Sequence, residues 1–225
     1  TNTFGTSVLC DVAVRAEVTK FVHISTDEVY GTIDEGSFVE TDVLTPRSPY
    51  SAAKAGSDLL ALSYHTTYGL PVVVTRCSNN YGPYQFPEKV IPLFTTNLLD
   101  GKQVPLYGDG LNVRDWIHVE DHNIAAHLVL EQGVPGEIYN IGAGNEVTNL
   151  ELTHRLLELT GRDESFIRPV EDRLGHDRRY SVNIDKVSAL GWSLSRTFDD
   201  SLAATVEWYR DHRDWWEPLK AKAGL

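Results

Sequence analysis

The chain has 225 residues, of which 41% are hydrophobic and 23% charged, and its formal net charge is -12 at pH 7. This composition is ordinary for a globular protein, and the negative charge argues against a nucleic-acid partner. No apolar run approaches the ~18 residues that a membrane-spanning helix needs, and two cysteines, Cys10 and Cys77, are too few for a disulfide framework. We therefore expect a cytoplasmic protein without a membrane segment.

Short apolar strands alternate with helices along the chain. We expect, in chain order, helix 2–17, strand 20–26, helix 48–69, strand 70–80, helix 87–101, helix 119–133, strand 136–144, helix 148–161 and helix 198–216. Thr148 and Glu151 fit a capping box at the start of one of these helices. The alternation predicts an α/β fold with a doubly wound, mostly parallel sheet, which binds ligands at the carboxyl ends of its strands.

Polar residues end the first strand in the segment HISTDEVYG, residues 23–31, where Thr26 precedes two adjacent carboxylates, Asp27 and Glu28. A turn with a helix N-cap explains such a segment, because acids near a helix start are common. The alternative is a pair of catalytic carboxylates at the edge of the sheet. The second strand ends in Asn79 and Asn80, which either reach a ligand or form a strand-terminal turn.

The segment SPYSAAK places Tyr50 and Lys54 four residues apart on a helix, so their side chains share a face. A neighbouring ammonium favours a phenolate and lowers the phenol pKa from roughly 10, which makes the pair a candidate general base for a hydroxyl group. The alternative is that Tyr50 packs at the helix start and Lys54 faces solvent. The position of the pair, ~24 residues after a strand that ends in Ser-Thr, favours catalysis.

Two other candidate sites lack the required spacing. The segment IYNIGAGNEV imitates a dinucleotide-binding fingerprint, because Gly142 and Gly144 follow a strand and an aspartate lies about 20 residues further on. A valine occupies the third glycine position, so we interpret this segment as a turn. His118, His122 and Cys77 have no spacing that suggests a metal site.

Seven segments occur in order along nearly the whole chain: STDEVYG, YSAAK, RCSNNYGPYQFPEKVIPLF, PLYGDG, VRDWIHVEDH, YNIGAGNEVTN and GHDRRY. By these segments the chain resembles the dTDP-glucose 4,6-dehydratases, a family of extended short-chain dehydrogenases/reductases, especially those of actinobacterial deoxysugar pathways. The resemblance implies a Rossmann-like lyase that converts dTDP-glucose to dTDP-4-keto-6-deoxyglucose. The reaction comprises oxidation at C4, elimination of water across C5 and C6, and return of the hydride to C6 by tightly bound NAD.

The resemblance also implies the catalytic roles. Tyr50 is the base for the C4 hydroxyl, while Lys54 lowers the pKa of this phenol and holds the nicotinamide ribose. Thr26 hydrogen-bonds the C4 oxygen, Glu28 takes the C5 proton, and Asp27 protonates the departing C6 hydroxyl. An elimination needs one acid and one base, which adjacent carboxylates in different environments can supply. An epimerase of the same superfamily has small residues at this strand end, so the two carboxylates favour a dehydratase.

Further residues are implied to contact the cofactor and the nucleotide-sugar. NAD contacts Tyr50, Lys54 and Asn80. The diphosphate pairs with Arg114, whose planar guanidinium gives bidentate contacts. The substrate residues that complete the set are Thr26, Asn79, Lys89, Val90, Pro105 to Tyr107, Asn140, Arg173 and His176. For the loop that carries the last two, the residues alone favour a solvated run of charges.

The resemblance divides the chain into two domains and predicts its assembly. Residues 1–83 and 115–143 form the C-terminal part of a dinucleotide-binding domain with the catalytic residues, and 84–114 and 144–225 form a nucleotide-sugar-binding domain. The family's glycine-rich phosphate loop precedes these segments, so we expect the chain to be part of a larger enzyme. A homodimer is expected through helix 2–17 and the Tyr50–Lys54 helix, which the family pairs as a bundle.

Two alternative functions stay open. The first is another NAD-dependent sugar-nucleotide epimerase or decarboxylase of the same fold. The second is a non-catalytic fragment that binds a nucleotide-sugar. The intact catalytic set argues against the fragment, and the missing glycine-rich loop argues for it.

Overall fold

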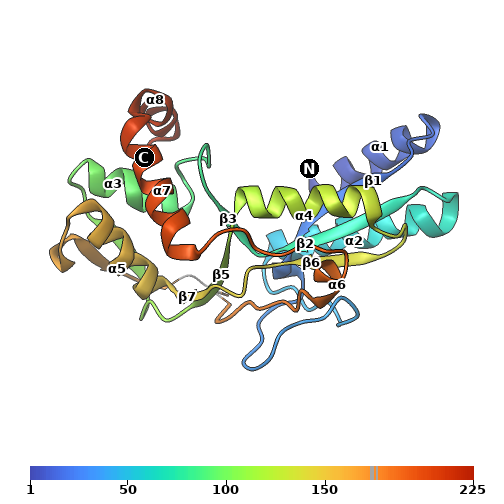
Figure 1. Cartoon of the computed structure of the whole chain (residues 1–225), viewed down its shortest axis with the longest axis horizontal. Coiled ribbons are helices and arrows are strands. Elements are labelled where there is room, and N and C mark those ends of the chain that lie inside the picture. The colour runs from blue at the N-terminus through green and yellow to red at the C-terminus, as the bar shows by residue number, and fades with distance from the viewer. Residues whose placement is uncertain (173–174, 176) are drawn as a thin grey trace.

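A computed structural model describes residues 1–172, 175 and 177–225 (Figure 1). The helices are α1 (Asn2–Arg15), α2 (Pro49–Tyr68), α3 (Val90–Leu99), α4 (Val119–Gln132), α5 (Asn149–Thr160), α6 (Asp185–Ser188), α7 (Phe198–Asp211), α8 (Arg213–Ala223) and the 3-10 helices η1 (Asp27–Val29) and η2 (Glu164–Phe166). The strands are β1 (Phe21–Thr26), β2 (Val72–Cys77), β3 (Asn79–Tyr81), β4 (Val104–Tyr107), β5 (Val113–His118), β6 (Ile138–Ile141), β7 (Glu146–Thr148) and β8 (Ile167–Val170). No helix within these described ranges is both long and apolar enough to cross a membrane.

A parallel sheet in the order β1-β2-β6 forms one half of the molecule. Successive residues of its central strand point to opposite faces. Val72 and Val74 pack with α1 and α2, whereas Val73 packs with α4, so helices cover both faces. At the carboxyl end, Thr26 pairs with Cys77, which brings the ends of β1 and β2 to the same edge of the sheet.

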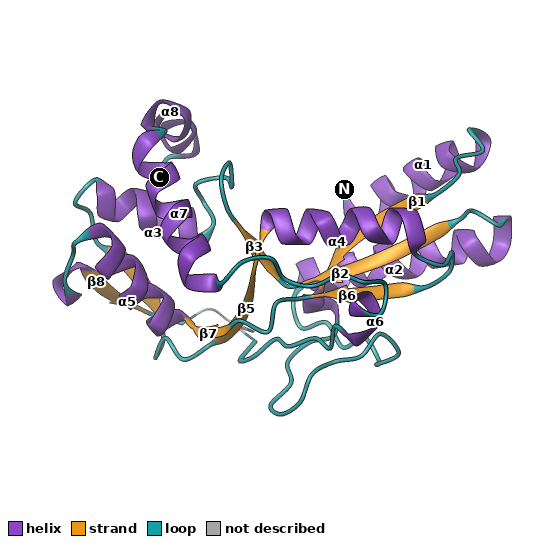
Figure 2. Ribbon diagram, in the orientation of Figure 1, coloured by secondary structure: helices purple, strands orange, loops and turns teal. Residues whose placement is uncertain are grey.

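The other half packs α3, α5 and α7 around two smaller sheets, β3-β5-β7 and β4-β8 (Figure 2). Its core contains Trp116 of β5, Leu152 and Leu156 of α5, and Phe198 of α7. Strands β3 and β5 connect the two halves, because β3 follows directly from β2 and pairs with β5. Both strands therefore lead from the parallel sheet into the second core.

Two elements expected as single units are divided. The strand expected over 70–80 changes sheets at Ser78, whose N–H donates to the Ile141 carbonyl of β6 at 2.9 Å, while the next residue already pairs with β5. The helix expected over 198–216 is α7 followed by α8, because His212 leaves the helical conformation with φ -118° and ψ 47°. Neither break coincides with a glycine or proline, which is why the sequence pattern missed both.

Two local predictions are confirmed. The Thr148 side chain accepts from the Glu151 N–H at 3.1 Å, and a Glu151 carboxylate oxygen accepts from the Thr148 N–H at 2.9 Å, which completes the capping box. The glycine-containing segment after β6 is a turn around the Asp115 carboxylate, which accepts N–H bonds from Ala143 and Asn145, each at 2.8 Å. A Cβ at Gly142 would lie 2.6 Å from that carboxylate, so this position requires glycine.

Candidate active site

The turn η1 presents two carboxylates at the end of β1. Thr26 caps this turn, because its hydroxyl accepts from the Glu28 N–H at 3.3 Å and donates to Asp27 Oδ1 at 3.2 Å. The Tyr30 N–H closes the turn on the Asp27 carbonyl at 3.0 Å. The two interpretations of this segment are therefore compatible, since a capped turn also holds both carboxylates at the sheet edge.

The two carboxylates have different environments. Asp27 is 3% exposed, and its burial, reinforced by the charges of Glu28 and Asp115, raises its pKa to about 8. Its Oδ2 atom has no hydrogen-bond partner among the described residues. Burial also raises the pKa of Glu28, but the nearby Arg114 charge opposes this shift. Asp27 is thus suited to hold a proton at neutral pH, and Glu28 is the better base.

Helix α2 presents Tyr50 and Lys54 beside this turn. The helix begins at Ser48 with a Ser48–Ser51 capping box and Pro49, which places Tyr50 in the first turn. The Lys54 ammonium donates to the Ile24 carbonyl of β1 at 2.7 Å. Burial raises the pKa of the Tyr50 phenol, and the charges of Glu28, Cys77 and Asp27 raise it further. The net shift of the Tyr50 pKa is thus upward in this arrangement, and the lowering expected from Lys54 stays a prediction.

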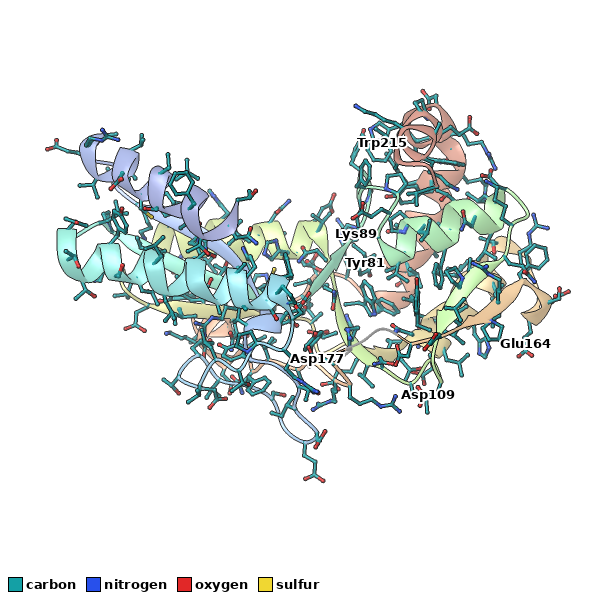
Figure 3. All side chains as sticks on the ribbon, turned by 180° about the vertical axis from the view of Figure 1, so that it is seen from behind. Tyr81, Lys89, Asp109, Glu164, Asp177 and Trp215 are labelled. Atoms are coloured by element: carbon teal, nitrogen blue, oxygen red, sulfur yellow. The ribbon has the colours of Figure 1, made fainter. Side chains whose placement is uncertain are left out.

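A cleft of about 510 Å³ lies between the two halves of the molecule. Figure 3 shows Lys89, Tyr81 and Asp177 where these halves meet. The cleft is lined by several residues that the sequence predicted: Glu28, Asn79, Lys89, Val90, Pro105, Leu106, Tyr107 and Arg114. It is also lined by residues that the sequence did not single out: Ser48, Glu88, Leu93, Phe94, Trp116, Asn149, Gly175, Asp177 and Tyr180.

Arg114 is fixed against one wall of this cleft. Its guanidinium donates to the Asp177 carbonyl at 2.9 Å and to the Val113 carbonyl at 2.7 Å, and it lies 4.2 Å from the centroid of the Tyr180 ring. The Tyr180 hydroxyl donates to the Asp177 carboxylate at 2.6 Å, which holds the loop over the arginine. Both loop residues belong to the segment GHDRRY, whose charges concealed this inward-facing role.

Three further predicted substrate residues are Asn140, Arg173 and His176. Asn140 lies outside the cleft lining: it is fully buried, and its side chain accepts from the Tyr30 hydroxyl at 2.9 Å and donates to the Phe38 carbonyl at 3.1 Å. We therefore reassign Asn140 from the substrate pocket to the core beneath it. Arg173 and His176 lie outside the described residues.

Five further predicted site residues do not line the cleft: Thr26, Asp27, Tyr50, Lys54 and Asn80. Thr26 is adjacent to Glu28, as the cap of η1 requires. Asn80 on β3 donates from its side-chain amide to the Ser78 carbonyl at 3.0 Å. The side-chain oxygens of Asn79 and Asn80 are buried without a hydrogen-bond partner in the described part of the chain. These oxygens are available to accept hydrogen bonds from a ligand.

The family model described as GDP-mannose 4,6 dehydratase matches residues 1–205. The chain belongs to this dehydratase family. The dTDP-glucose 4,6-dehydratase of Streptomyces antibioticus is 60% identical over 223 residues, which are 99% of this chain and 67% of that protein. The dTDP-glucose 4,6-dehydratase of an Actinoplanes strain is 59% identical, over 96% of this chain and 68% of that protein.

Solved structures of dehydratases and epimerases share the fold. The dTDP-glucose 4,6-dehydratase DesIV from Streptomyces venezuelae, crystallised with NAD, matches with a TM-score of 0.97 and 59% identity, over 98% of this chain and 69% of that chain. The UDP-glucose 4-epimerase from Thermus thermophilus, also with NAD, has a TM-score of 0.88 and 32% identity, over 94% and 70%. The predicted Rossmann-like fold and the similarity to actinobacterial NAD-dependent dehydratases are confirmed, and the chain spans about two thirds of these proteins.

Proposed function

We propose that this chain is the catalytic and nucleotide-sugar-binding part of an NAD-dependent dTDP-glucose 4,6-dehydratase. The observation that carries the proposal is the pair of unlike carboxylates, Asp27 and Glu28, that η1 holds beside the Tyr50–Lys54 helix. Dehydration requires an acid and a base at neighbouring carbons, which an epimerisation at C4 does not. The reaction converts dTDP-glucose to dTDP-4-keto-6-deoxyglucose and serves deoxysugar synthesis.

Each side chain moves or holds one proton. The Tyr50 phenolate takes the proton of the C4 hydroxyl, and the Thr26 hydroxyl hydrogen-bonds the same oxygen. The C4 ketone that results makes the C5 hydrogen acidic, so the Glu28 carboxylate removes it. Asp27, kept protonated by burial, donates its proton to the C6 hydroxyl, which leaves as water. Glu28 then returns a proton to C5 as the 6-deoxy product forms.

The residues beside η1 fit the predicted cofactor. When bound, NAD would supply the hydride chemistry at C4 and C6 that the chain's own residues lack. Tyr50, Lys54 and Asn80 would hold its nicotinamide end, because hydroxyl and ammonium donors and an unpaired buried amide oxygen suit ribose and carboxamide groups. The pKa of Tyr50 is raised in this arrangement, and we propose that the Lys54 ammonium lowers it when it leaves the Ile24 carbonyl and approaches the phenol.

The two halves have different proposed tasks. Residues 1–83 and 115–143 carry the cofactor end and the catalytic groups, and 84–114 and 144–225 bind the nucleotide-sugar. The returning segment with Val182, Val187 and Trp192 packs on the first half, so the chain crosses the cleft again. The cytoplasm is the proposed location, because Cys10 and Cys77 are both free thiols.

Incubation of the complete protein with dTDP-glucose tests the proposal directly. Nuclear magnetic resonance of the product distinguishes the candidates, since the dehydratase yields a keto sugar with a C6 methyl group. A C4 epimer that retains the C6 hydroxyl would favour the alternative epimerase, and binding without conversion would favour a non-catalytic fragment. Either result would contradict the proposal.

We expect Arg114→Ala to weaken dTDP-glucose binding by about 10- to 100-fold, the loss of one or two charged hydrogen bonds, with a smaller effect on kcat. The guanidinium lines the cleft at a fixed position, where it meets the diphosphate. Calorimetric titration gives the dissociation constant. Arg114→Lys is the matched control, because it keeps the positive charge but loses the bidentate guanidinium. Its dissociation constant for dTDP-glucose should lie between those of the wild type and Arg114→Ala. An unchanged dissociation constant in Arg114→Ala would remove the arginine from the binding site.

We also propose a homodimer through α1 and α2, whose outer surface exposes Phe4, Leu9 and Leu59 at 79%, 60% and 60%. Such a helical surface fits a self-complementary bundle of four helices. The complete protein should have a dimeric mass by light scattering at micromolar concentration, and Leu9→Asp should give a monomer. Val43→Asp, in an exposed loop, should stay dimeric. A monomeric wild type would refute this interface.

A further inference from the structure

A continuous chain of buried polar side chains runs beneath the candidate active site. Asp58 of α2 accepts a hydrogen bond from Arg76 Nε of β2 at 3.0 Å. Arg76 also donates to the Tyr30 hydroxyl at 2.8 Å, and this hydroxyl donates to Asn140 Oδ1 of β6 at 2.9 Å. None of the four residues is more than 2% exposed. The chain therefore joins α2, β2, β6 and the segment after η1 inside the core.

Two members of this buried chain, Asp58 and Tyr30, lie next to elements of the proposed mechanism. Asp58 lies one helical turn beyond Lys54, and His23 Nε2 of β1 lies 3.2 Å from its Oδ1 atom. Tyr30, which bonds both Arg76 and Asn140, directly follows η1, and its N–H donates to the Asp27 carbonyl. The Tyr50–Lys54 helix and the carboxylates on η1 are thus linked through buried side chains.

Stability alone is a weak explanation for this arrangement. Burying an ion pair such as Asp58–Arg76 costs desolvation, and apolar side chains of the same volume often stabilise a core as well or better. The ion pair does orient the Tyr30 side chain. The Arg76 guanidinium lies 4.7 Å from the Tyr30 ring centroid and also donates to its hydroxyl. The Tyr30 ring also stacks on the Phe38 ring, and 4.9 Å separates their centroids. Tyr30 is thereby held in one orientation.

Val29 and the Tyr30 side chain both connect the turn η1 to the surrounding core. The turn contains three residues, and its internal hydrogen bonds, from Thr26 to Glu28 and from Tyr30 to Asp27, are local to the turn. Local bonds shape a turn without fixing where it sits relative to another helix. Val29 of η1 packs with Ala55 of α2, and the Tyr30 side chain adds a hydrogen-bonded connection, because its hydroxyl contacts β2 and β6.

We propose that Asp58, Arg76 and Tyr30 are positioning residues, which hold the Asp27–Glu28 turn in register with the Tyr50 helix so that both act on one sugar ring. This inference rests on the proposed function. Its consequence is specific: loosening Tyr30 should slow proton transfer at C5 while binding of the nucleotide-sugar, made by the other half of the cleft, stays the same.

Tyr30→Phe in the complete protein tests the inference, because it removes only the hydroxyl and keeps the ring against Phe38. We expect kcat for dTDP-glucose to fall by about 10-fold or more, since small displacements of catalytic groups have effects of this size, with KM within about three-fold. Exchange of the C5 hydrogen of dTDP-4-keto-6-deoxyglucose with deuterium oxide should slow by the same factor as kcat. If Tyr30→Phe folds poorly, Arg76→Lys is the second variant, because it keeps the positive charge and loses the bidentate guanidinium. It should likewise lower kcat and slow C5 exchange while KM stays nearly unchanged.

Tyr139→Phe is the matched control. Tyr139 neighbours Asn140 on β6, is 3% exposed, and its hydroxyl accepts only the Val134 N–H at 3.1 Å among its described hydrogen bonds. It should lose thermal stability without losing kcat or C5 exchange. If Tyr30→Phe also keeps both rates within about two-fold, or if both variants lose them equally, Tyr30 is a packing residue. Glu28→Gln distinguishes a failure of the positioning role from a failure of the proposed function. If this variant leaves C5 exchange unchanged, Glu28 is not the C5 base and the proposed function fails.

Discussion

Tyr50→Phe should lower kcat by about 10²–10⁴-fold, the usual size of general-base catalysis. The phenol acts only as the C4 hydroxyl loses its proton, so its loss removes transition-state stabilisation and leaves the ground state unchanged. The dissociation constant of dTDP-glucose, measured by calorimetry, should therefore change by no more than about three-fold. Conversion to the 4-keto-6-deoxy sugar is followed by nuclear magnetic resonance.

Tyr68→Phe is the control for this experiment. Tyr68 ends the same helix and is 62% exposed, so removing its hydroxyl should leave both constants unchanged. A Tyr50→Phe variant that keeps more than about a tenth of the wild-type rate would show that this tyrosine only packs at the helix start. The comparison also concerns Lys54. The pKa of the Tyr50 phenol is raised in the arrangement in which Lys54 donates to the Ile24 carbonyl, so a catalytic Tyr50 would support the proposed role of Lys54 in lowering that pKa.

Asp27→Asn and Glu28→Gln should each slow the elimination by about 10²-fold or more while C4 oxidation continues. Asparagine and glutamine keep the shape of the side chains but exchange no proton. Oxidised sugar and reduced nicotinamide should therefore accumulate together in a single turnover, which the absorbance of the reduced cofactor records. Asp121→Asn is the control and should leave the elimination unchanged, because Asp121 is a buried carboxylate that accepts the Ser195 N–H and is not among the groups that raise the Asp27 pKa.

The pH dependence gives an independent test of the acid. Asp27 has a pKa of about 8, raised above its ordinary value mainly by burial, so it carries its proton below that pH and loses it above. The rate of elimination should accordingly fall as pH rises through about 8, and the Asp27→Asn variant should lack this decline. Wild-type rates for both variants, or a decline unaffected by Asp27→Asn, would show that the roles are assigned to the wrong residues.

Local chemistry made much of the fold predictable. The apolar run at 72–74 packs against helices on both faces, and capping residues at Ser48 and Thr148 mark real helix starts. The switch of the chain between sheets at Ser78 depends on competing partners, Ile141 on one side and β5 on the other. No residue type signals that competition, so tertiary pairing alone decides where the strand is divided.

The site was predictable where residues near in sequence act together. Asp27 with Glu28, and Tyr50 with Lys54, were recognised from their spacing. Long-range contacts were not: the Asp177 carbonyl that fixes Arg114 lies 63 residues further along the chain. For the same reason the raised pKa of Tyr50 was not foreseen, because the charges that raise it come from η1 and β2 and not from its own helix.

Tracing hydrogen through the reaction tests the central claim most directly. The complete protein is given dTDP-glucose deuterated at C4 in ordinary water, and dTDP-glucose in deuterium oxide, and the products are read by nuclear magnetic resonance. Both incubations should yield dTDP-4-keto-6-deoxyglucose. We expect the C4 deuterium in the C6 methyl group in the first, and a solvent deuteron at C5, placed there by Glu28, in the second. A product that retains its C6 hydroxyl, or a dehydrated product with no solvent deuteron at C5, would contradict the central claim.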